Sequence, residues 1–171
     1  MKSGAEFSQD RKYRYLLWRE WDGRKPYAMF IGLNPSTADE TKDDATIRRL
    51  IRFAYDWKFG GMFMLNIFAY RATDPKEMKS AENPIGEIYN SNNQRNDDFI
   101  FEYADRLSVI KVVACWGNHG RYLDRGNQVR ELLKESQGLA NIGGLQAFKM
   151  TKQGQPSHPL YLPQTATTKA I

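Results

Sequence analysis

The stretch Tyr27–Ser36, with the sequence YAMFIGLNPS, decides how the rest of the chain is interpreted. Its first seven residues are nearly all apolar, which is typical of a strand buried on both faces of a parallel sheet. The run stops at Asn34-Pro35, because proline lacks the backbone donor that a central strand needs. We therefore expect a buried strand over Tyr27–Leu33 that brings Asn34 to its carboxyl end.

The same pattern recurs further along the chain. Apolar runs predict a second strand over Met62–Phe68, a third over Val109–Trp116 and a fourth over Leu145–Met150. Strands that alternate with helical segments at this spacing indicate right-handed βαβ units. We predict a three-layer α/β/α fold with a mostly parallel, four-stranded central sheet.

The segments between these strands have helical features. Asp43 or Asp44 can cap a helix that ends at Gly60-Gly61. The apolar residues of this segment are spaced as on one face of a helix: Ile47, Leu50, Ile51, Ala54 and Tyr55. Further helices are expected over Asn96–Leu107 and Tyr122–Ser136, and a long polar connection over Tyr70–Asn92.

An N-terminal hairpin is also predicted. Tyr13–Trp21 and Tyr27–Leu33 flank Asp22-Gly23, the dipeptide favoured in tight hairpin turns. The hairpin would cover about residues 12–33 and the core about residues 27–163. The 171 residues contain no repeat and no low-complexity block, so we expect a single domain over residues 1–171.

Composition narrows the function classes. The single cysteine, Cys115, excludes an internal disulfide, a Cys-based zinc site and a four-cysteine iron–sulfur cluster. The two histidines are too few for a His-rich metal site, although a His/Asp site stays open. Asp39, Asp43 and Asp44 could bind a divalent ion, but helix capping and solvation explain them more simply. The usual nucleotide-binding and zinc-protease motifs do not occur. We therefore expect neither a metal nor a cofactor.

Charge and hydropathy bear on partners and location. The net charge of +5 is small, but no acidic residue follows Glu135, so that stretch can approach phosphates without repulsion. DNA is the expected partner, and a nucleotide-like small molecule is the alternative. The apolar runs are far shorter than the ~20 residues of a membrane helix, and no secretory signal is visible. We expect a cytoplasmic protein without membrane contact.

Polar residues follow each predicted strand, and parallel strands bring their carboxyl ends to one edge of the sheet, where ligands bind. Asn34 could orient a water molecule, or it could only cap a turn. Asn66 could make a two-point contact with a nucleobase edge, or it could satisfy loop backbone. His158 could donate a hydrogen bond to a leaving group, or it could be a surface histidine.

The order of the motifs adds to this interpretation. IGLNPS, FMLN with FAYRA, VVACWGNHG and HPLYL together resemble the uracil-DNA glycosylase superfamily, over roughly residues 27–163. Those enzymes carry GQDPY or GINPG, then an LLLN strand, an LLWG strand end and an HPSPL loop. The chain is more similar still to an uncharacterised bacterial and phage family that carries GLNPSTAD and HPLYL. For that family, the fold analogy says little about activity.

The resemblance implies a role for each matching residue. Asn34, with Gly32 and Pro35, matches the motif that holds the attacking water, and Asn66 matches the asparagine that reads the flipped pyrimidine. His158 matches the histidine that stabilises the departing base anion. Leu162 would match the leucine wedge that enters the duplex. The remaining residues expected to bind substrate are Ser36, Trp116, Gly117, His119 and Leu160.

Three departures from the superfamily pattern concern the chemistry. Asn34 stands where the most active branch has an aspartate. A catalytic general base, which contributes about 10²–10⁴-fold in rate, is therefore missing at this position. Ser36 replaces the tyrosine that shapes the pyrimidine pocket, and Leu160 replaces a serine that grips phosphate. These departures leave the identity of the recognised nucleobase undetermined and allow a larger or modified nucleobase.

The first hypothesis is an enzyme that hydrolyses the N-glycosidic bond of a damaged or modified base in DNA. Such a site needs donors for the base and a positioned water, not a strong nucleophile. A non-catalytic nucleic-acid-binding module of the same fold is one alternative. A hydrolase or binder of free nucleotides is the other.

Overall fold

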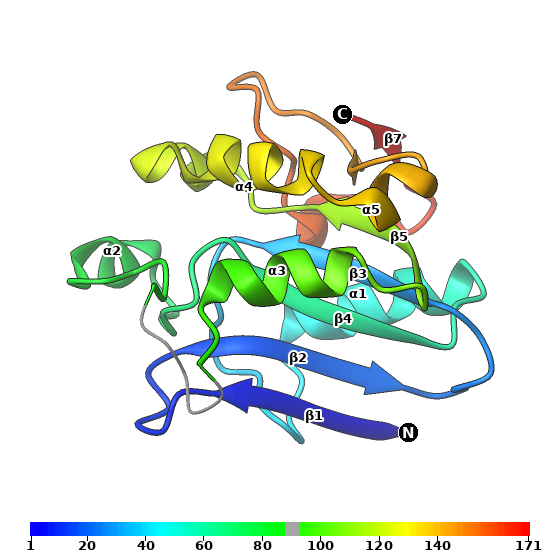
Figure 1. Ribbon diagram of the computed structural model, residues 1–171, viewed down its shortest axis with the longest axis horizontal. Helices are drawn as coiled ribbons and strands as arrows, with labels where there is room; N and C mark the ends of the chain where they lie inside the picture. Colours follow the sequence, from blue (N-terminus) through cyan, green and yellow to red (C-terminus); the bar gives the residue numbers. More distant parts are fainter. Residues whose placement is uncertain (88–92) are drawn as a thin grey trace.

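A seven-stranded sheet forms the centre of the protein in the computed structural model, which describes residues 1–87 and 93–171 (Figure 1). The strand order is β1-β2-β4-β3-β5-β6-β7. The strands are β1 (Lys2–Phe7), β2 (Arg14–Glu20), β3 (Tyr27–Gly32), β4 (Gly61–Asn66), β5 (Val109–Ala114), β6 (Gln146–Ala147) and β7 (Lys169–Ala170).

The sheet is mixed, which corrects the prediction of a mostly parallel, four-stranded one. The four strands expected from the apolar runs, β4, β3, β5 and β6, are neighbours and run parallel. Strands β1 and β2 add an antiparallel extension on one side, and β7 adds one on the other. Strand β2 is buried and corresponds to the first arm of the expected hairpin, whereas β1 is largely exposed and β7 is short, so these two lack the apolar runs by which the parallel strands are recognised.

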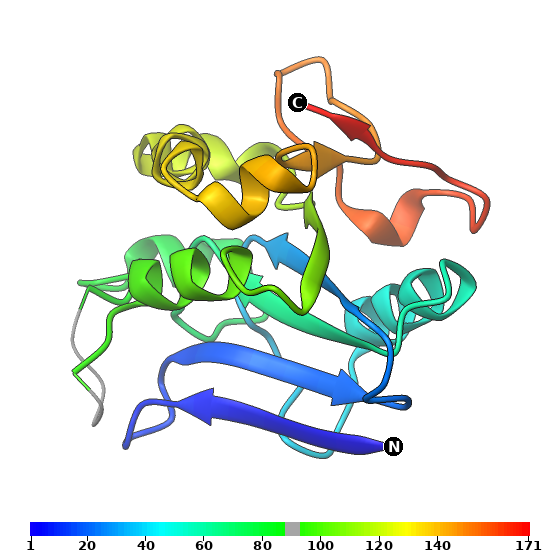
Figure 2. The same ribbon diagram turned by 45° about the vertical axis from the view of Figure 1, so that its right-hand side comes forward.

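Helices cover both faces of the sheet (Figure 2). Helix α1 (Ala45–Asp56) packs on one face, while α3 (Asn96–Ala104), α4 (Arg125–Lys134) and α5 (Gln137–Asn141) pack on the other. Strand β3 shows why its run is continuously apolar: Ala28 and Phe30 face the α1 side, whereas Met29 and Ile31 face the α3 and α4 side. The remaining elements are α2 (Pro75–Ser80) and the 3₁₀ segments η1 (Asn118–Asp124) and η2 (Pro159–Tyr161).

Helix α1 is capped by Asp44, one of the two predicted candidates, but it buries a somewhat different face. The Asp44 carboxylate accepts a hydrogen bond from the Ile47 amide at 2.9 Å, which satisfies one of the free donors of the first turn. Phe53 is fully buried and its ring contacts that of Phe148, whereas Tyr55 is 61% exposed. The prediction that Tyr55 lies on the buried face is therefore wrong.

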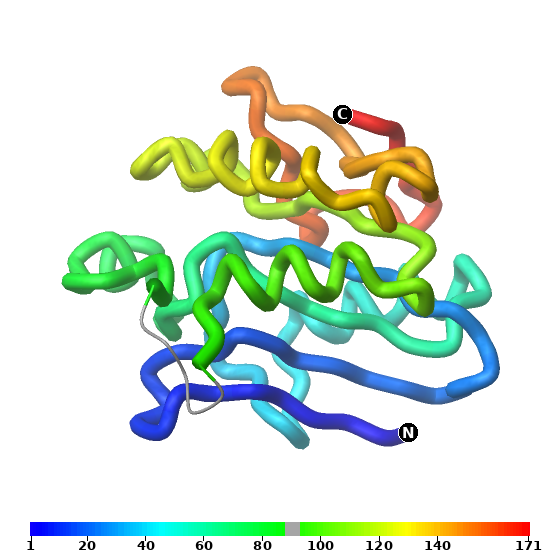
Figure 3. The backbone as a smooth tube through the Cα atoms, in the orientation of Figure 1, coloured from blue at the N-terminus to red at the C-terminus, as the bar shows by residue number. Residues whose placement is uncertain are grey.

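The predicted hairpin over residues 12–33 does not form. Strand β4 lies between β2 and β3, as the backbone tube in Figure 3 shows, and β2 instead forms an antiparallel pair with β1. The connection between β2 and β3 passes over the start of β4, where the Trp21 and Asp22 amides both donate to the Gly60 carbonyl at 2.9 Å. Gly60 allows this close approach, because a Cβ there would lie 1.9 Å from the Asp22 carbonyl oxygen.

The other boundaries shift by a few residues. The connection expected over residues 70–92 contains α2, which Asp74 caps, and its last residues lie outside the described part of the chain. The helix expected over Tyr122–Ser136 begins only at Arg125, because η1 precedes it. The fourth predicted strand shortens to β6. Among the described residues, no helix has both the length and the apolar character needed to cross a membrane.

Candidate functional site

A pocket of about 650 Å³ opens at the carboxyl ends of the parallel strands. From β3 the chain crosses to β4 on one side, and it later returns to β5 on the other side of β3. In open α/β sheets, ligands bind at this kind of switch point. Loops after β3, β4 and β5, the first turn of α1 and segment η2 all line the pocket, whose volume is in the range of small-molecule sites.

The pocket gathers most of the residues that the sequence singled out. Those that line it are Gly32, Asn34, Ser36, Asn66, Trp116, Gly117, His119, His158 and Leu160. Pro35 and Leu162 do not line it. Pro35 is buried in the loop, where its carbonyl accepts from the Ala72 amide at 2.9 Å. Leu162 packs against the core beside α1, and its carbonyl accepts a hydrogen bond from Arg49, so it is not placed to act as a wedge.

Asn34 is held by the nitrogen end of its amide. Nδ2 donates to the Ala72 carbonyl at 2.7 Å and to the carbonyl of the next residue in the chain, Pro35, at 3.1 Å. Among the described residues, none donates a hydrogen bond to the other end of the amide, Oδ1. Asn34 can therefore accept a hydrogen bond from a water molecule or ligand in the pocket.

Asn66 is held by the opposite end. Its side chain is 1% exposed, and Oδ1 accepts from Arg14 Nη2 at 3.2 Å. Nδ2 is buried and has no hydrogen-bond partner in the described part of the chain. An unsatisfied buried donor costs about 1–3 kcal/mol, which a ligand acceptor would recover. Gly32 makes room for this amide, because a Cβ there would lie 3.0 Å from Asn66 Nδ2.

Arg14 is a pocket residue that the sequence analysis missed. Arg14 is 2% exposed, and its guanidinium donates to two uncharged acceptors, Asn66 Oδ1 and the Ala38 carbonyl at 3.0 Å. Burial lowers the pKa of Arg14 to about 10, so it remains charged at neutral pH. A charge behind the Asn66 amide polarises it and strengthens the Nδ2 donor. The signal in the sequence was an arginine within the apolar stretch Tyr13–Trp18.

The hydrogen bonds around His158 favour one tautomer. Nδ1 accepts from the Leu160 amide at 3.3 Å, so the proton of the neutral ring lies on Nε2. Burial lowers the pKa of His158, and the Asp44 carboxylate opposes this effect in part. The neutral ring therefore persists at neutral pH and offers Nε2 as a donor. Gly117, at φ +73°, passes close behind this histidine.

The remaining pocket residues are structural or lie at the rim. The Trp116 indole is 1% exposed and donates to Gln155 Oε1 at 2.9 Å, so it forms the wall and is not a free stacking surface. His119 is exposed, with Nδ1 3.1 Å from Lys79 Nζ. Ser36 Oγ donates to a neighbouring threonine hydroxyl at 3.3 Å. Burial raises the pKa of the Cys115 thiol to about 12, so it is no nucleophile at neutral pH.

One carboxylate lines the pocket among the described residues, and it belongs to Asp44. No group of three or more histidine, cysteine or acidic side chains in this part of the chain could hold a metal ion. A second cavity, of about 340 Å³, lies against α4 and α5 and includes none of the predicted site residues.

Fold and pocket together define a class: an α/β protein whose candidate ligand site is built from polar groups at the carboxyl edge of its parallel strands. The chain belongs to the DUF1643 family, described as proteins of unknown function, whose family model matches residues 14–160. No curated protein and no solved structure matches the chain. The matched span begins at Arg14 and ends at Leu160, and both residues line the pocket.

Proposed function

We propose that the protein hydrolyses the N-glycosidic bond of a damaged or modified base in DNA. The observation that carries the proposal is the meeting of Asn34, Asn66 and His158 in one pocket of about 650 Å³. They come from three segments far apart in the sequence, and each has one hydrogen-bonding atom without a partner in the described part of the chain. The same three residues match the functional positions of the glycosylase motifs.

The free atoms suit the charge that this reaction develops. Cleavage of the glycosidic bond builds negative charge on the base and positive charge on the sugar. Asn66 Nδ2 and His158 Nε2 can donate to the departing base, and the buried charge of Arg14 supports the first of these donors. Asn34 Oδ1 can hold the water. No step requires a nucleophilic side chain or a metal.

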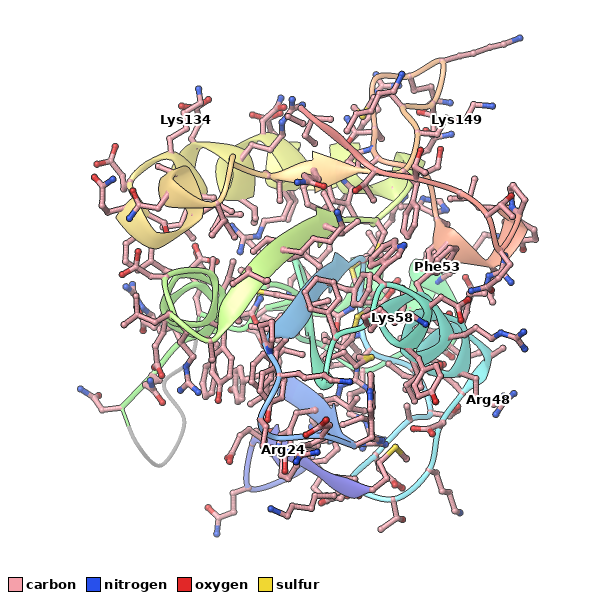
Figure 4. All side chains as sticks on the ribbon, turned by 90° about the vertical axis from the view of Figure 1, so that its right-hand side faces the viewer. Arg24, Arg48, Phe53, Lys58, Lys134 and Lys149 are labelled. Atoms are coloured by element: carbon pink, nitrogen blue, oxygen red, sulfur yellow. The ribbon has the colours of Figure 1, made fainter. Side chains whose placement is uncertain are left out.

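The surface beside the pocket suits a duplex. Segment η2 exposes two apolar side chains, Tyr161 at 89% and Leu160 at 37%, and Tyr161 lies next to the His158 ring. A wedge of this kind can fill the stack when a base is extruded. Exposed cations such as Arg48, which points away from the sheet in Figure 4, could contact phosphates. In this proposal, Tyr161 takes the wedge role first expected of Leu162.

The test is a panel of single- and double-stranded oligonucleotides that carry uracil, thymine mismatches, and hydroxymethylated or glycosylated bases. After incubation, alkali converts each abasic site into a strand break. We expect breaks at one or more modified bases, and their loss in a His158→Ala protein purified identically, which excludes a contaminating glycosylase. Absence of abasic product on every oligonucleotide would overturn the proposal.

The wedge is tested by a pair of neighbouring substitutions. We expect Tyr161→Ala to slow cleavage of duplex about tenfold while sparing single strands, since only the duplex requires base extrusion. Leu162→Ala should instead lower the melting temperature, because its side chain packs against the core. An equal effect of Tyr161→Ala on both substrates would remove the wedge from the proposal.

Binding of free nucleotides is a second candidate, favoured by the buried Arg14 charge with its uncharged partners. An anionic ligand would compensate that charge. A thermal-shift screen of nucleosides against the matching nucleotides separates this candidate from DNA binding, because a tight ligand raises the melting temperature. A non-catalytic DNA-binding module would show salt-dependent binding without abasic product.

A further inference from the structure

The proposed reaction needs a proton acceptor that Asn34 cannot supply. Its Nδ2 is committed to two carbonyls, and an amide oxygen can hold a water molecule but is not basic at neutral pH. Hydrolysis must nevertheless remove a proton from the attacking water, and a carboxylate is the usual acceptor. The question is therefore which carboxylate faces the pocket.

Asp44 is the acidic residue that lines the pocket in the described part of the chain. Its Oδ1 accepts from the Ile47 amide at 2.9 Å, which fixes the carboxylate at the start of α1. No hydrogen bond from a described residue reaches its Oδ2. Among charged groups, Asp44 has the largest electrostatic effect on both Arg14 and His158, so it lies near both sides of the base site.

Neighbouring carboxylates are occupied elsewhere. Asp43 forms an ion pair with Arg19 at 2.8 Å, and Asp39 accepts hydrogen bonds from the Thr41 and Lys42 amides. Neither lines the pocket. The orphaned donor of Asn66 is an independent sign that the pocket takes a polar ligand, because a buried amide group without a partner is costly.

We propose that Asp44 is the catalytic carboxylate of this pocket, an inference that rests on the proposed glycosylase function. Water held by Asn34 Oδ1 forms the bond to C1′ of the sugar while the bond from C1′ to the base nitrogen breaks. The base leaves with the electron pair, held by Asn66 Nδ2 and His158 Nε2. The proton of the water passes to Asp44, and the base anion later takes a proton from solvent. The charge of Asp44 also stabilises the positive sugar.

A binding experiment tests this role without knowledge of the natural base. The probes are two duplexes, one with a cationic pyrrolidine abasic nucleotide and one with a neutral tetrahydrofuran abasic nucleotide. The first mimics the charged sugar of the transition state. We expect the wild-type protein to bind it about tenfold more tightly, the effect of one partly buried charge pair. Asp44→Asn should bind both duplexes equally.

The chain offers a matched control in Asp74→Asn. Asp74 also caps a helix, α2, and its neighbours Thr73 and Pro75 line the pocket while Asp74 does not. This variant should keep the preference for the cationic duplex. Asparagine and serine are as good caps as aspartate, so Asp44→Asn and Asp44→Ser should both melt near the wild-type temperature.

The outcomes separate the two proposals. A wild-type protein that binds neither duplex overturns the glycosylase proposal itself. Equal binding of both duplexes by the wild type, or a preference that survives in Asp44→Asn, overturns the role of Asp44 alone. On the oligonucleotide of the panel that is cleaved fastest, the single-turnover rate of Asp44→Asn should fall about 10²–10⁴-fold. An unchanged rate would also overturn that role.

Discussion

Asn34 follows strand β3 and Asn66 ends its parallel neighbour β4, yet the two side-chain amides are held by opposite ends. Two loop carbonyls, that of Pro35 after β3 and that of Ala72 after β4, accept hydrogen bonds from the Asn34 nitrogen, and no described residue donates to the Asn34 oxygen. At the end of β4, Arg14 captures the Asn66 oxygen and leaves its nitrogen free. One amide therefore offers an acceptor to the pocket, and the other offers a donor.

The difference shows that the partner, and not the residue type, decides what an asparagine can recognise. The partners of Asn34 are backbone carbonyls of two loops, whereas the partner of Asn66 is an arginine side chain from β2, in the antiparallel extension of the sheet. Strand β2 therefore does more than extend the sheet, because its Arg14 fixes which end of the Asn66 amide is left without a partner.

The largest expected effect comes from Asn66→Asp. This change replaces the free donor with a carboxylate oxygen that repels a base carbonyl, and we expect cleavage to fall about 10²–10³-fold. The melting temperature should stay the same or rise, because Arg14 gains a charged partner in place of a neutral one. Single-turnover kinetics and thermal unfolding measure the two effects.

Each result for this variant bears on the comparison. Full activity would mean that the Asn66 nitrogen reads nothing. A large loss of stability would contradict the contact between Arg14 and Asn66 Oδ1. Only the combination of a stable fold and a lost activity supports the assignment of opposite amide polarities.

Asn34→Asp should act on stability. Its carboxylate would face the Ala72 and Pro35 carbonyls in place of the present donor, at a cost of about 1–3 kcal/mol in the free energy of unfolding. For a chain of this size, each kcal/mol lowers the melting temperature by about 2–4 °C. Asn34→Ala removes the donor without adding repulsion, so it should cost less. Equal stability of Asn34→Asp and wild type would mean that the amide is turned the other way.

The smallest effect concerns His158, whose acceptor atom, Nδ1, is held by the Leu160 backbone amide. Burial lowers its pKa below the ordinary value of 6.5, so the unfolded chain binds a proton before the native protein does as the pH falls. Stability is therefore fully present above pH 6.5 and is lost as the pH falls toward the lowered pKa. We expect His158→Asn to reduce the loss of melting temperature between about pH 7.5 and about pH 5.5 by about 2 °C. An unchanged loss would mean that the ring is not desolvated.

The sequence predicts best what depends on local pattern. The buried strand beginning at Tyr27 and the helix capped by Asp44 follow from apolar runs and capping chemistry, and the structure has both. The convergence of Asn34, Asn66 and His158 follows from the parallel order of the strands. Each of these features can be predicted from the residues of one segment or from one rule of sheet topology.

What the sequence could not predict depends on pairing between distant segments. Asp22-Gly23 is a good turn, but nothing local shows that β4 enters between the two strands it joins. Arg14 becomes a pocket residue only because β2 pairs with β4, and Asp44 becomes one only because α1 begins beside the loop of Asn34. Phe53 is buried in the core and Tyr55 is not, because Phe148, far along the chain, packs against Phe53.

The position of β4 also affects how the chain can fold as it leaves the ribosome. Until residues 61–66 emerge, β2 lacks one neighbour and β3 has none from the preceding chain, so both expose unpaired edges. The β1–β2 hairpin can form early, but the pocket-forming sheet must wait for this later insertion. Nascent chains that stall before Gly61 should therefore be the most prone to aggregate during synthesis.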